Sequence, residues 1–461
     1  MKLLTISEVL TAINGNLTRG DNQLAIHNVC RQLKNLKDHS LYFHMSKKPI
    51  EPSIFMGKSH YVIVTEDNRI GRYIDPSSCL IIVENSKKAY LDFIDYYRGL
   101  FQIPVIGVTG TCGKTTTKEM IKHILKKDYR VHGTFLSQNG LHLNLQYLMG
   151  IDENTEMAVF EMGVAYPGNI RISGKYFKPT IGVITNIGEA HLEGCKTLEK
   201  YVQAKGEMLE VLSSNGTLIL NEDDENIKKL SLESFKGKML SFGFNKDADF
   251  RASNVKYENH GMQYRLHFSN EIYEVFIPGY GEHNVYNSLS AIASAKIVGI
   301  PIEEGIKRLR DFKVMERHVK TYKGLNGSTV IDDTWSCNPS SVNSAIEVLK
   351  SISNGKKEVF VLGKMQRLGN QLKEQHEKMG KTMMDYGGVD YLIAVGSSAA
   401  LTGESAIASG MNPSNVFFAN DANELEAILD KINNEDMIIL FKMSLGKMDP
   451  SYRKVVEKYR L

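Results

Sequence analysis

The stretch GVTGTCGKTTTKEM, from Gly107 to Met120, constrains the fold of this chain more than any other part of its sequence. It follows the apolar run FQIPVI and precedes a segment whose apolar residues recur at helical spacing. A strand that ends in glycines and opens into a helix directs several backbone N–H groups and a helix N-terminus at one concavity. Hydrogen bonds and the helix dipole together favour an anion there. We therefore expect Gly110, Thr111 and Gly113 to surround a phosphate group.

The residues that follow this loop suit a nucleotide. Lys114 supplies a mobile positive charge for β- and γ-phosphates, and a hydroxyl from Thr115 or Thr116 can complete the oxygen shell of a Mg²⁺ ion. Val108 stands where the strict GxxxxGK[ST] pattern has its first glycine, so the sequence predicts a P-loop variant. The simpler alternative is a glycine-rich turn without a ligand, but GxxGKTT between a strand and a helix is more specific than a glycine cluster alone.

A P-loop leaves kinases, motors, GTPases and ligases open, and three later residues narrow the choice. Glu161 ends the run MAVFE, where a parallel strand delivers it to the same sheet edge as the loop. His191, in TNIGEAHLEG, follows the next strand and can reach that edge too. A carboxylate and an imidazole beside a triphosphate suit a second divalent cation, although alone a strand-end glutamate can cap a helix and a loop histidine is usually solvated. Lys205 lies in YVQAKGEMLE, a helical pattern in which most lysines face solvent.

Composition places the chain among ordinary globular proteins. A chain of 461 residues is too long for one hydrophobic core, so its length predicts about two to four domains. The 56 basic residues are matched by 53 acidic ones, and no basic arm stands out, which argues against a dedicated nucleic-acid binder. The five cysteines are scattered and odd in number, so the sequence favours neither a disulfide framework nor a zinc site and fits a reducing cytoplasm.

The beginning of the chain reads as a helix rather than as a targeting segment. Thr5 and Glu8 have the spacing of a capping box, and Glu8 interrupts the apolar core that a signal peptide needs. No apolar run approaches the roughly 18 residues that span a bilayer. We expect a protein without a membrane span.

The order of the apolar runs predicts an α/β fold with three domains. Residues 1–100 hold SLYF, YVIVTE and CLIIVE between polar connections, which indicates a small α/β domain. From Phe101 on, strand-length runs alternate with helical patterns, which predicts a mostly parallel sheet with helices on both faces. Within residues 247–279 the period changes to two, so we expect YRLHF and YEVFI to pair. After the Asn-Gly turn signal in KGLNG, TVIDD, EVFVLG, YLIAVG, VFFAN and MIILFK alternate with helices, as in a doubly wound, Rossmann-like domain.

These residues belong to a series of motifs that resembles the Mur ligase family, the ATP-dependent amide-forming ligases of peptidoglycan assembly, and most closely its branch that adds D-alanyl-D-alanine. The series keeps the family's order over residues 101 to about 380, with a weaker echo in LFKMSLGKM. Its members are TGTCGKTTTKEM, EMGVAYPGNI, TNIGEAHLEG, AKGEM, NEDDE, GEHNVYNSLSAIASA, VIDDTWSCNPSSV and LGKMQRLGNQLKEQH. Such a series is far more specific than a single motif, whereas residues 1–100 resemble the family only faintly.

The resemblance implies a three-domain enzyme. Residues 1–100 would bind the nucleotide-linked substrate, residues 101–316 would form the ATPase domain, and residues 317–461 would form the Rossmann-like domain that docks the amine. By similarity Lys114 holds the ATP phosphates, and Thr115 with Glu161 holds one Mg²⁺. By the same similarity, His191 and Lys205 would hold a second Mg²⁺. Lys205 matches the lysine that the family carbamylates, which would convert it into an anion.

The resemblance also assigns residues to the nucleotide and to the substrates. Those that flank the nucleotide or bring the C-terminal domain to it are Asn221, Asp224, Asn287, Arg317 and Asp332. Those expected at the substrates are Asn139, Asn186, Asn338, Lys364, Arg367 and Lys442.

Several departures from the family pattern fall where substrate is bound. The uridine-nucleotide stretch reads NVCRQLKNLKDHSLYF, and His142 in SQNGLHL replaces a proline. LGDMLELG becomes LGKMQRLG, which puts Lys364 and Arg367 where two acids are usual, and KGSRGM becomes KMSLGK. Reversing two charges changes ligand preference substantially, while divergence at exposed positions is the alternative explanation.

The function that the resemblance implies is ATP-dependent addition of D-alanyl-D-alanine to UDP-N-acetylmuramoyl-tripeptide through an acyl phosphate. Two alternatives stay open: a paralogue that joins another carboxylate and amine outside peptidoglycan synthesis, and a nucleotide-binding regulator without turnover. A plain P-loop kinase would leave Lys205 and the C-terminal domain unexplained. We expect a cytoplasmic monomer that uses two Mg²⁺ ions, acts on small molecules, and has neither nucleic-acid nor membrane partners.

Overall fold

The structure, a computed structural model, describes residues 1–30, 32–140 and 145–461, and it confirms the α/β class. The predicted departure at His142 therefore lies outside the described residues. The chain divides into two compact units. The first unit comprises Met1–Val105, Tyr129–Phe160 and Lys175–Lys178, and the second comprises Ile106–Asp128, Glu161–Gly174 and Pro179–Leu461.

The first unit contains a five-stranded sheet in the order β2-β7-β6-β5-β4, parallel except for β2. The runs SLYF, YVIVTE and CLIIVE supply β5, β6 and β7, as predicted. The Thr5–Glu8 capping box is also present, because each residue's side chain accepts the other's backbone N–H. The elements are β1 (Leu4–Thr5), α1 (Ile6–Ile13), β2 (Asn16–Arg19), β3 (Ala25–Ile26), β4 (Asn28–Cys30), β5 (Ser40–Phe43), β6 (Val62–Thr65), β7 (Cys79–Ile82) and α2 (Ser86–Gly99).

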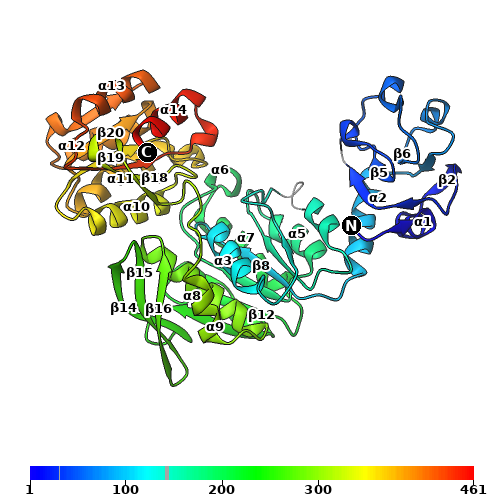
Figure 1. The fold of residues 1–461 in the computed structure, drawn as a ribbon, viewed down its shortest axis with the longest axis horizontal. Helices are drawn as coiled ribbons and strands as arrows, with labels where there is room; N and C mark the ends of the chain where they lie inside the picture. Colours follow the sequence, from blue (N-terminus) through cyan, green and yellow to red (C-terminus); the bar gives the residue numbers. More distant parts are fainter. Residues whose placement is uncertain (31, 141–144) are drawn as a thin grey trace. The chain divides into compact units, whose positions relative to one another are not determined.

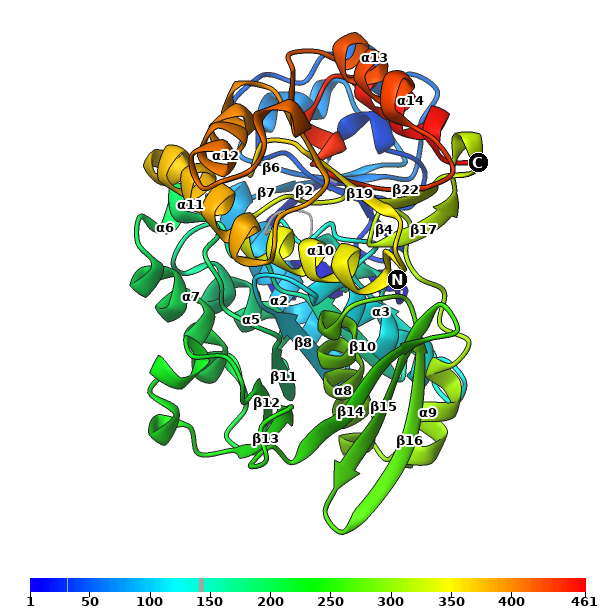
Figure 2. The same cartoon turned by 90° about the vertical axis from the view of Figure 1, so that its left-hand side faces the viewer.

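The largest sheet has nine strands in the order β16-β15-β14-β13-β12-β11-β8-β10-β9. The pairs β9–β10, β8–β11, β11–β12, β12–β13 and β13–β14 are parallel, whereas β14, β15 and β16 form antiparallel hairpins. Figure 2 shows these three strands side by side, and YRLHF pairs with YEVFI as predicted. The strands are β8 (Val105–Thr109), β9 (Val131–Gly133), β10 (Met157–Glu161), β11 (Ile181–Ile184), β12 (Thr217–Asn221), β13 (Lys238–Gly243), β14 (Phe250–Glu258), β15 (Gly261–Phe268) and β16 (Glu271–Pro278).

Helices follow the strands of this region, as a doubly wound sheet requires. The helix after the phosphate loop, α3, buries Met120, Ile121, Ile124 and Leu125, the positions whose spacing predicted it. It packs against α8, which also contacts the hairpin strands. The helices are α3 (Lys114–Leu125), α5 (Asn169–Phe177), α6 (Leu192–Cys195), α7 (Leu198–Val211), α8 (Glu282–Ile297) and α9 (Ile302–Leu309).

The C-terminal part contains a six-stranded sheet in the order β17-β18-β22-β19-β20-β21. All five predicted runs are parallel strands, and β17 is added antiparallel to β18 through a turn at Asn326, whose φ is +56°. The predicted Rossmann-like arrangement is confirmed. The strands are β17 (Lys320–Lys323), β18 (Thr329–Asp333), β19 (Lys357–Leu362), β20 (Tyr391–Val395), β21 (Val416–Ala419) and β22 (Met437–Lys442).

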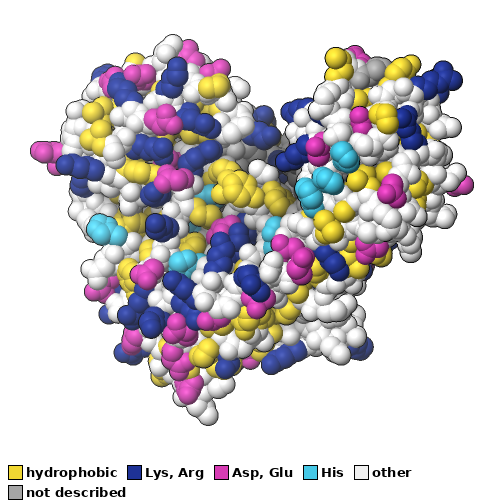
Figure 3. Space-filling model, turned by 45° about the vertical axis from the view of Figure 1, so that its right-hand side comes forward, with side chains coloured by type: hydrophobic (Ala, Val, Ile, Leu, Met, Phe, Trp, Pro, Cys, Tyr) yellow, Lys and Arg dark blue, Asp and Glu magenta, His cyan; other side chains and the backbone are white. Residues whose placement is uncertain are grey.

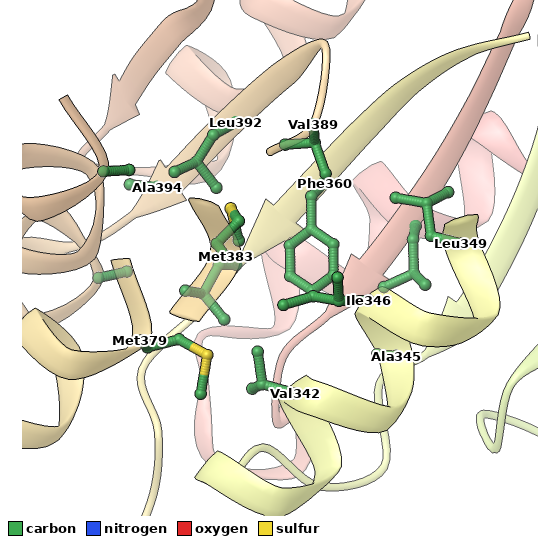
Figure 4. Packing of buried hydrophobic residues seen from close by; sticks show 14 of the residues in the cluster. Val342, Ala345, Ile346, Leu349, Phe360, Met379, Met383, Val389, Leu392 and Ala394 are labelled. Atoms are coloured by element: carbon green, nitrogen blue, oxygen red, sulfur yellow. The ribbon is translucent and has the colours of Figure 1, made fainter. Parts of the chain in front are cut away.

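Helices cover both faces of this sheet (Figure 1). On one face lie α10 (Pro339–Ile352), α11 (Leu372–Asp385) and α12 (Ser397–Ala408), and on the other α13 (Ala422–Ile432) and α14 (Pro450–Tyr459). Figure 4 shows Phe360 of β19 between Ile346 of α10 and Met383 of α11 in the first of these two cores. Burial on both faces explains why these strands read as continuous apolar runs.

Figure 3 shows basic and acidic side chains scattered among one another over the face in view. Within residues 1–30, 32–140 and 145–461, no helix has the length and apolar character needed to cross a membrane. Each of the five cysteines is a free thiol.

Candidate active site

The loop between β8 and α3 has the conformation that its glycines predict. Gly110 has φ +147° and Gly113 has φ +78°. A Cβ on Gly110 would lie 1.9 Å from Oγ1 of Thr185, and one on Gly113 would lie 2.2 Å from Oδ1 of Asn287. Neither position tolerates a side chain, so both glycines are needed for the close approach of the loop to its neighbours.

The end of β11 holds this loop in place. Thr111 donates its backbone N–H to the carbonyl of Asn186 at 2.8 Å, and Cys112 donates its N–H to Oδ1 of the same residue at 2.9 Å. The Asn186 amide donates back to the Cys112 carbonyl at 3.1 Å, and the hydroxyl of Thr185 donates to that carbonyl at 2.6 Å. Asn186, which the resemblance assigns to the substrates, therefore braces the phosphate loop.

The first turn of α3 brings a cation and a hydroxyl to the loop. Lys114 donates from Nζ to the carbonyl of Thr111 at 2.9 Å. Thr115 donates its hydroxyl to Oε2 of Glu161 at 2.8 Å, and Glu161 is buried at the end of β10. A hydroxyl beside a carboxylate is a set of hard oxygen donors, which fits a Mg²⁺ ion. Thr116 is half-buried on the same turn.

Lys205 lies beneath the loop rather than in solvent. It is 1% exposed and donates from Nζ to the carbonyl of Gly110 at 2.8 Å and to Oγ1 of Thr109 at 3.1 Å. Its Nζ lies 5.2 Å from the centre of the Tyr201 ring. Burial, reinforced by the charge of Lys114, holds the pKa of Lys205 well below its usual range, which favours the neutral amine.

His191 lies beside Tyr201, with ring centres 5.8 Å apart and an interplanar angle of 16°. Nη1 of Arg367 lies 3.2 Å from its Nδ1 and 3.3 Å from its Nε2. Burial lowers the pKa of His191 to about 2, with further contributions from Arg367, Lys205 and Lys114. The imidazole is therefore neutral.

The described side chains fit one divalent cation better than two. Lys205 presents an amine that donates to two oxygens, and a guanidinium covers His191. Neither offers an anionic oxygen in this arrangement. Among the residues that the structure describes, no group of three or more His, Cys, Asp or Glu side chains could hold a metal ion.

Three of the residues assigned to the nucleotide contact either the start of α3 or the segment after β11 that braces the phosphate loop. Oδ1 of Asn287, on α8, accepts the Thr117 hydroxyl at 3.2 Å. Asn221 donates from Nδ2 to the Thr185 carbonyl at 3.0 Å. The carboxylate of Asp224 accepts the Ile187 N–H at 2.7 Å, so it fixes the loop that follows β11.

A cavity of about 140 Å³ lies beside two other assigned residues, Arg317 and Asp332. Arg317 donates to the carbonyl of Thr334 at 3.0 Å and lies 5.1 Å from the Trp335 ring centre. Nη1 of Arg460 donates to Oδ2 of Asp332 at 2.6 Å, and Asp332 is 1% exposed. The sequence gives no signal for Arg460, because this contact joins residues 128 positions apart. The lining residues are Arg317, Asp332, Leu445, Arg453, Val456, Glu457 and Arg460.

Two of the residues assigned to the substrates, Asn186 and Asn338, both contact Cys112 of the phosphate loop. Asn338 caps α10, and its Oδ1 lies 3.5 Å from Sγ of Cys112. Lys442 is buried in an ion pair with Asp333 at 2.5 Å, whereas Lys364 is exposed. Asn139 belongs to the first unit and is half-buried.

Two regions of the chain match domains of a known enzyme family. The Mur ligase middle domain matches residues 108–295, and the Mur ligase, glutamate ligase domain matches residues 315–442. The chain is 27% identical to the UDP-N-acetylmuramoyl-tripeptide--D-alanyl-D-alanine ligase of Bacillus subtilis (strain 168), over 98% of each chain. It is 30% identical to the ligase of the same name from Rickettsia prowazekii (strain Madrid E), over 68% of this chain and 70% of that one.

The solved structure of MurF from Acinetobacter baumannii has the same three-domain fold. Its TM-score is 0.86 at 23% sequence identity, and the match covers 99% of this chain and 100% of that chain. The matched ranges include the phosphate loop, Glu161, His191 and Lys205. From its sequence relatives and its fold, the chain belongs to the Mur ligase family.

Proposed function

We propose that the chain is an ADP-forming ligase that uses ATP to add D-alanyl-D-alanine to UDP-N-acetylmuramoyl-tripeptide in peptidoglycan synthesis. The observation that carries this proposal is the burial of Lys205 against Gly110 of the phosphate loop, 2.8 Å from Nζ to the carbonyl oxygen. A plain P-loop kinase has no need of a lysine there. Similarity over 98% of the chain to a relative with this name supports the choice of substrates.

The proposed reaction follows from the chemistry of carboxylates, which are poor acyl donors because their leaving group would be oxide. A carboxylate oxygen of the substrate attacks the γ-phosphorus of ATP, the bond to ADP breaks, and an acyl phosphate forms. The amine then attacks the acyl carbon, phosphate leaves, and the nitrogen loses a proton to give the amide. Lys114 and the loop N–H groups neutralise the charge of the phosphates during the first step.

We assign one Mg²⁺ ion to Thr115 and Glu161, where it would neutralise phosphate charge when bound. A second ion at His191, with a carbamylated Lys205, is what the resemblance implies, but the guanidinium of Arg367 covers that imidazole. The lowered pKa of Lys205 favours carbamylation, because a neutral amine is the form that attacks carbon dioxide. Conversion would replace an amine by a carboxylate at the base of the loop.

We propose that each of the three domains binds a different substrate. We assign the nucleotide-linked substrate to residues 1–100, ATP to residues 101–316 and the amine to residues 317–461. The boundaries are supported by the ends of elements, since α2 ends at Gly99 before β8 begins, and α9 ends at Leu309 before β17 begins at Lys320. We expect a monomer in the cytoplasm, where ATP is supplied.

Lys364 and Arg367 favour a second candidate, a paralogue with another carboxylate or amine, because the family pattern has acids at both positions. Incubation of UDP-muramoyl-tripeptide with ATP and a panel of dipeptides, followed by mass spectrometry of amide products, separates the two. Product with D-alanyl-D-alanine supports the proposed function, and product only with other pairs supports the paralogue.

A regulator without turnover is tested by phosphate release. The wild-type chain should release phosphate in the presence of both substrates, and Lys114→Ala should abolish that release. Lys127→Ala, an exposed lysine beyond the end of α3, is the matched control. No release under any substrate combination would support the regulator.

A further inference from the structure

Arg367 and His191 come from different parts of the fold and meet beside the phosphate loop. Arg367 lies in the loop after β19, whereas His191 is the N-cap residue directly before α6. Nη1 of Arg367 lies within 3.3 Å of both ring nitrogens of His191. Both residues have left-handed backbones, with φ +62° for Arg367 and +55° for His191. Non-glycine residues adopt this conformation only where their surroundings hold them in it.

The loop that carries Arg367 is held at several points. Met365 donates its N–H to Nε2 of His376 at 3.2 Å, and Gln366 donates its N–H to the carbonyl of Cys337 at 2.8 Å. The backbone of Arg367 itself accepts the N–H of Glu193 at 3.3 Å. The guanidinium is therefore placed by its loop rather than by the reach of a free side chain.

The guanidinium keeps most of its hydrogen-bonding capacity. Guanidinium has five N–H donors, and Arg367 uses only Nη1 among the described residues. The side chain is exposed. The only side chain within hydrogen-bonding distance of it among the described residues is the imidazole of His191, so its charge has no anionic partner in that part of the chain.

A divalent cation on His191 would meet this charge directly. Either ring nitrogen that could ligate the ion lies within 3.3 Å of Arg367 Nη1. An ion bound to either nitrogen would lie a few ångströms from this charge, and like charges that close repel each other. A chain with an acid at position 367 would instead attract the ion.

We propose that Arg367 takes the place of the second divalent cation and supplies its positive charge to the phosphoryl group during transfer. This inference rests on the proposed ligase function. It makes Arg367 a catalytic residue provided by the C-terminal domain, in the manner of an arginine finger. Phosphoryl transfer would then require the loop of residues 364–369 to be docked beside His191, which ties activation of the acid to the domain that receives the amine.

Counting bound metal tests this proposal without turnover. The full chain is titrated with Mn²⁺ in the presence of a non-hydrolysable ATP analogue, and free Mn²⁺ is measured by electron paramagnetic resonance. We expect one ion per wild-type chain and two per Arg367→Glu chain. Lys381→Glu, which makes the same charge change at an exposed position on α11, should bind one. Any other pair of counts for the wild type and Arg367→Glu overturns the proposal.

Kinetics give the second measurement. Arg367→Gln, which keeps a polar side chain and removes the charge, should lower the rate of ADP formation about 100-fold with little change in the KM for ATP. An unchanged rate overturns the proposal, provided that the melting temperatures of variant and wild type agree. Failure of the wild type to form any amide would instead refute the proposed function, and the metal count would still decide the role of Arg367.

Discussion

The hydroxyl of Thr115 donates to the carboxylate of Glu161 across 2.8 Å and joins the first turn of α3 to the end of β10. The two residues are 46 positions apart in the sequence. They meet because parallel strands deliver their carboxyl ends to one edge of the sheet. The contact places two oxygen donors for Mg²⁺ beside the phosphate loop.

Replacing Glu161 by Gln should weaken the binding of Mg²⁺-ATP about 10- to 100-fold and leave the melting temperature close to that of the wild type. The amide still accepts the Thr115 hydroxyl, but it offers the ion no charge. Titration calorimetry with a non-hydrolysable analogue measures the change. Glu233→Gln, at an exposed site, is the control. Equal affinities for wild type and Glu161→Gln would remove Glu161 from the metal site.

Lys205→Ala should abolish amide formation and lower the free energy of unfolding by about 1–3 kcal/mol, because the Gly110 carbonyl and the Thr109 hydroxyl lose a buried partner. If Lys205 acts as a carbamate, millimolar formate or acetate should restore part of the activity. Activity in a series of carboxylate concentrations is the measurement. No rescue at any concentration would leave Lys205 a structural amine.

The unfolding free energy should depend on pH through His376. Burial, with a smaller contribution from Lys364, lowers the pKa of His376 from 6.5 to about 4, so the unfolded chain binds the proton first as pH falls. Stability is therefore lost between about pH 6.5 and pH 4, by about 3 kcal/mol over the full window. Denaturant titrations should show a flatter profile for His376→Gln than for the wild type. Parallel pH profiles for the two chains would show that His376 has the same pKa in the folded and the unfolded state, which would contradict the prediction.

Arg460→Ala should destabilise the C-terminal sheet by about 2 kcal/mol, because it leaves the buried carboxylate of Asp332 without its cation. Arg453→Ala removes an exposed arginine from α14, the helix that ends directly before Arg460, and should change stability little. Asp332→Asn together with Arg460→Ala should recover part of the loss. Chemical denaturation compares the four chains, and equal effects of the two arginine variants would contradict the role given to Arg460.

The sequence predicted most of the scaffold because the signals are local. Apolar runs buried on both faces specify parallel strands, and the glycines of the phosphate loop specify a conformation that other residues avoid. Glu161 could be placed at the site because its strand ends there. These inferences need only the residues near each position and the rule for parallel sheets.

Contacts between distant residues were beyond such reasoning. The helical pattern around Lys205 did not show that its amine lies beneath the loop, because that depends on the packing of α7 against β11. Asn186 and Asp224 were expected at ligands, yet their polar atoms bond to backbone groups of neighbouring loops. Arg367 and His191 are brought into contact only by the fold. Both have left-handed backbones, but neither is a glycine, so the sequence did not predict this conformation.

The most direct measurement follows oxygen from the acid substrate. UDP-muramoyl-tripeptide labelled with ¹⁸O in its terminal carboxylate is incubated with ATP, D-alanyl-D-alanine and the chain, and the released phosphate is analysed by mass spectrometry. An acyl phosphate intermediate requires one labelled oxygen in each phosphate for each amide formed. Amide formation with unlabelled phosphate would contradict the account.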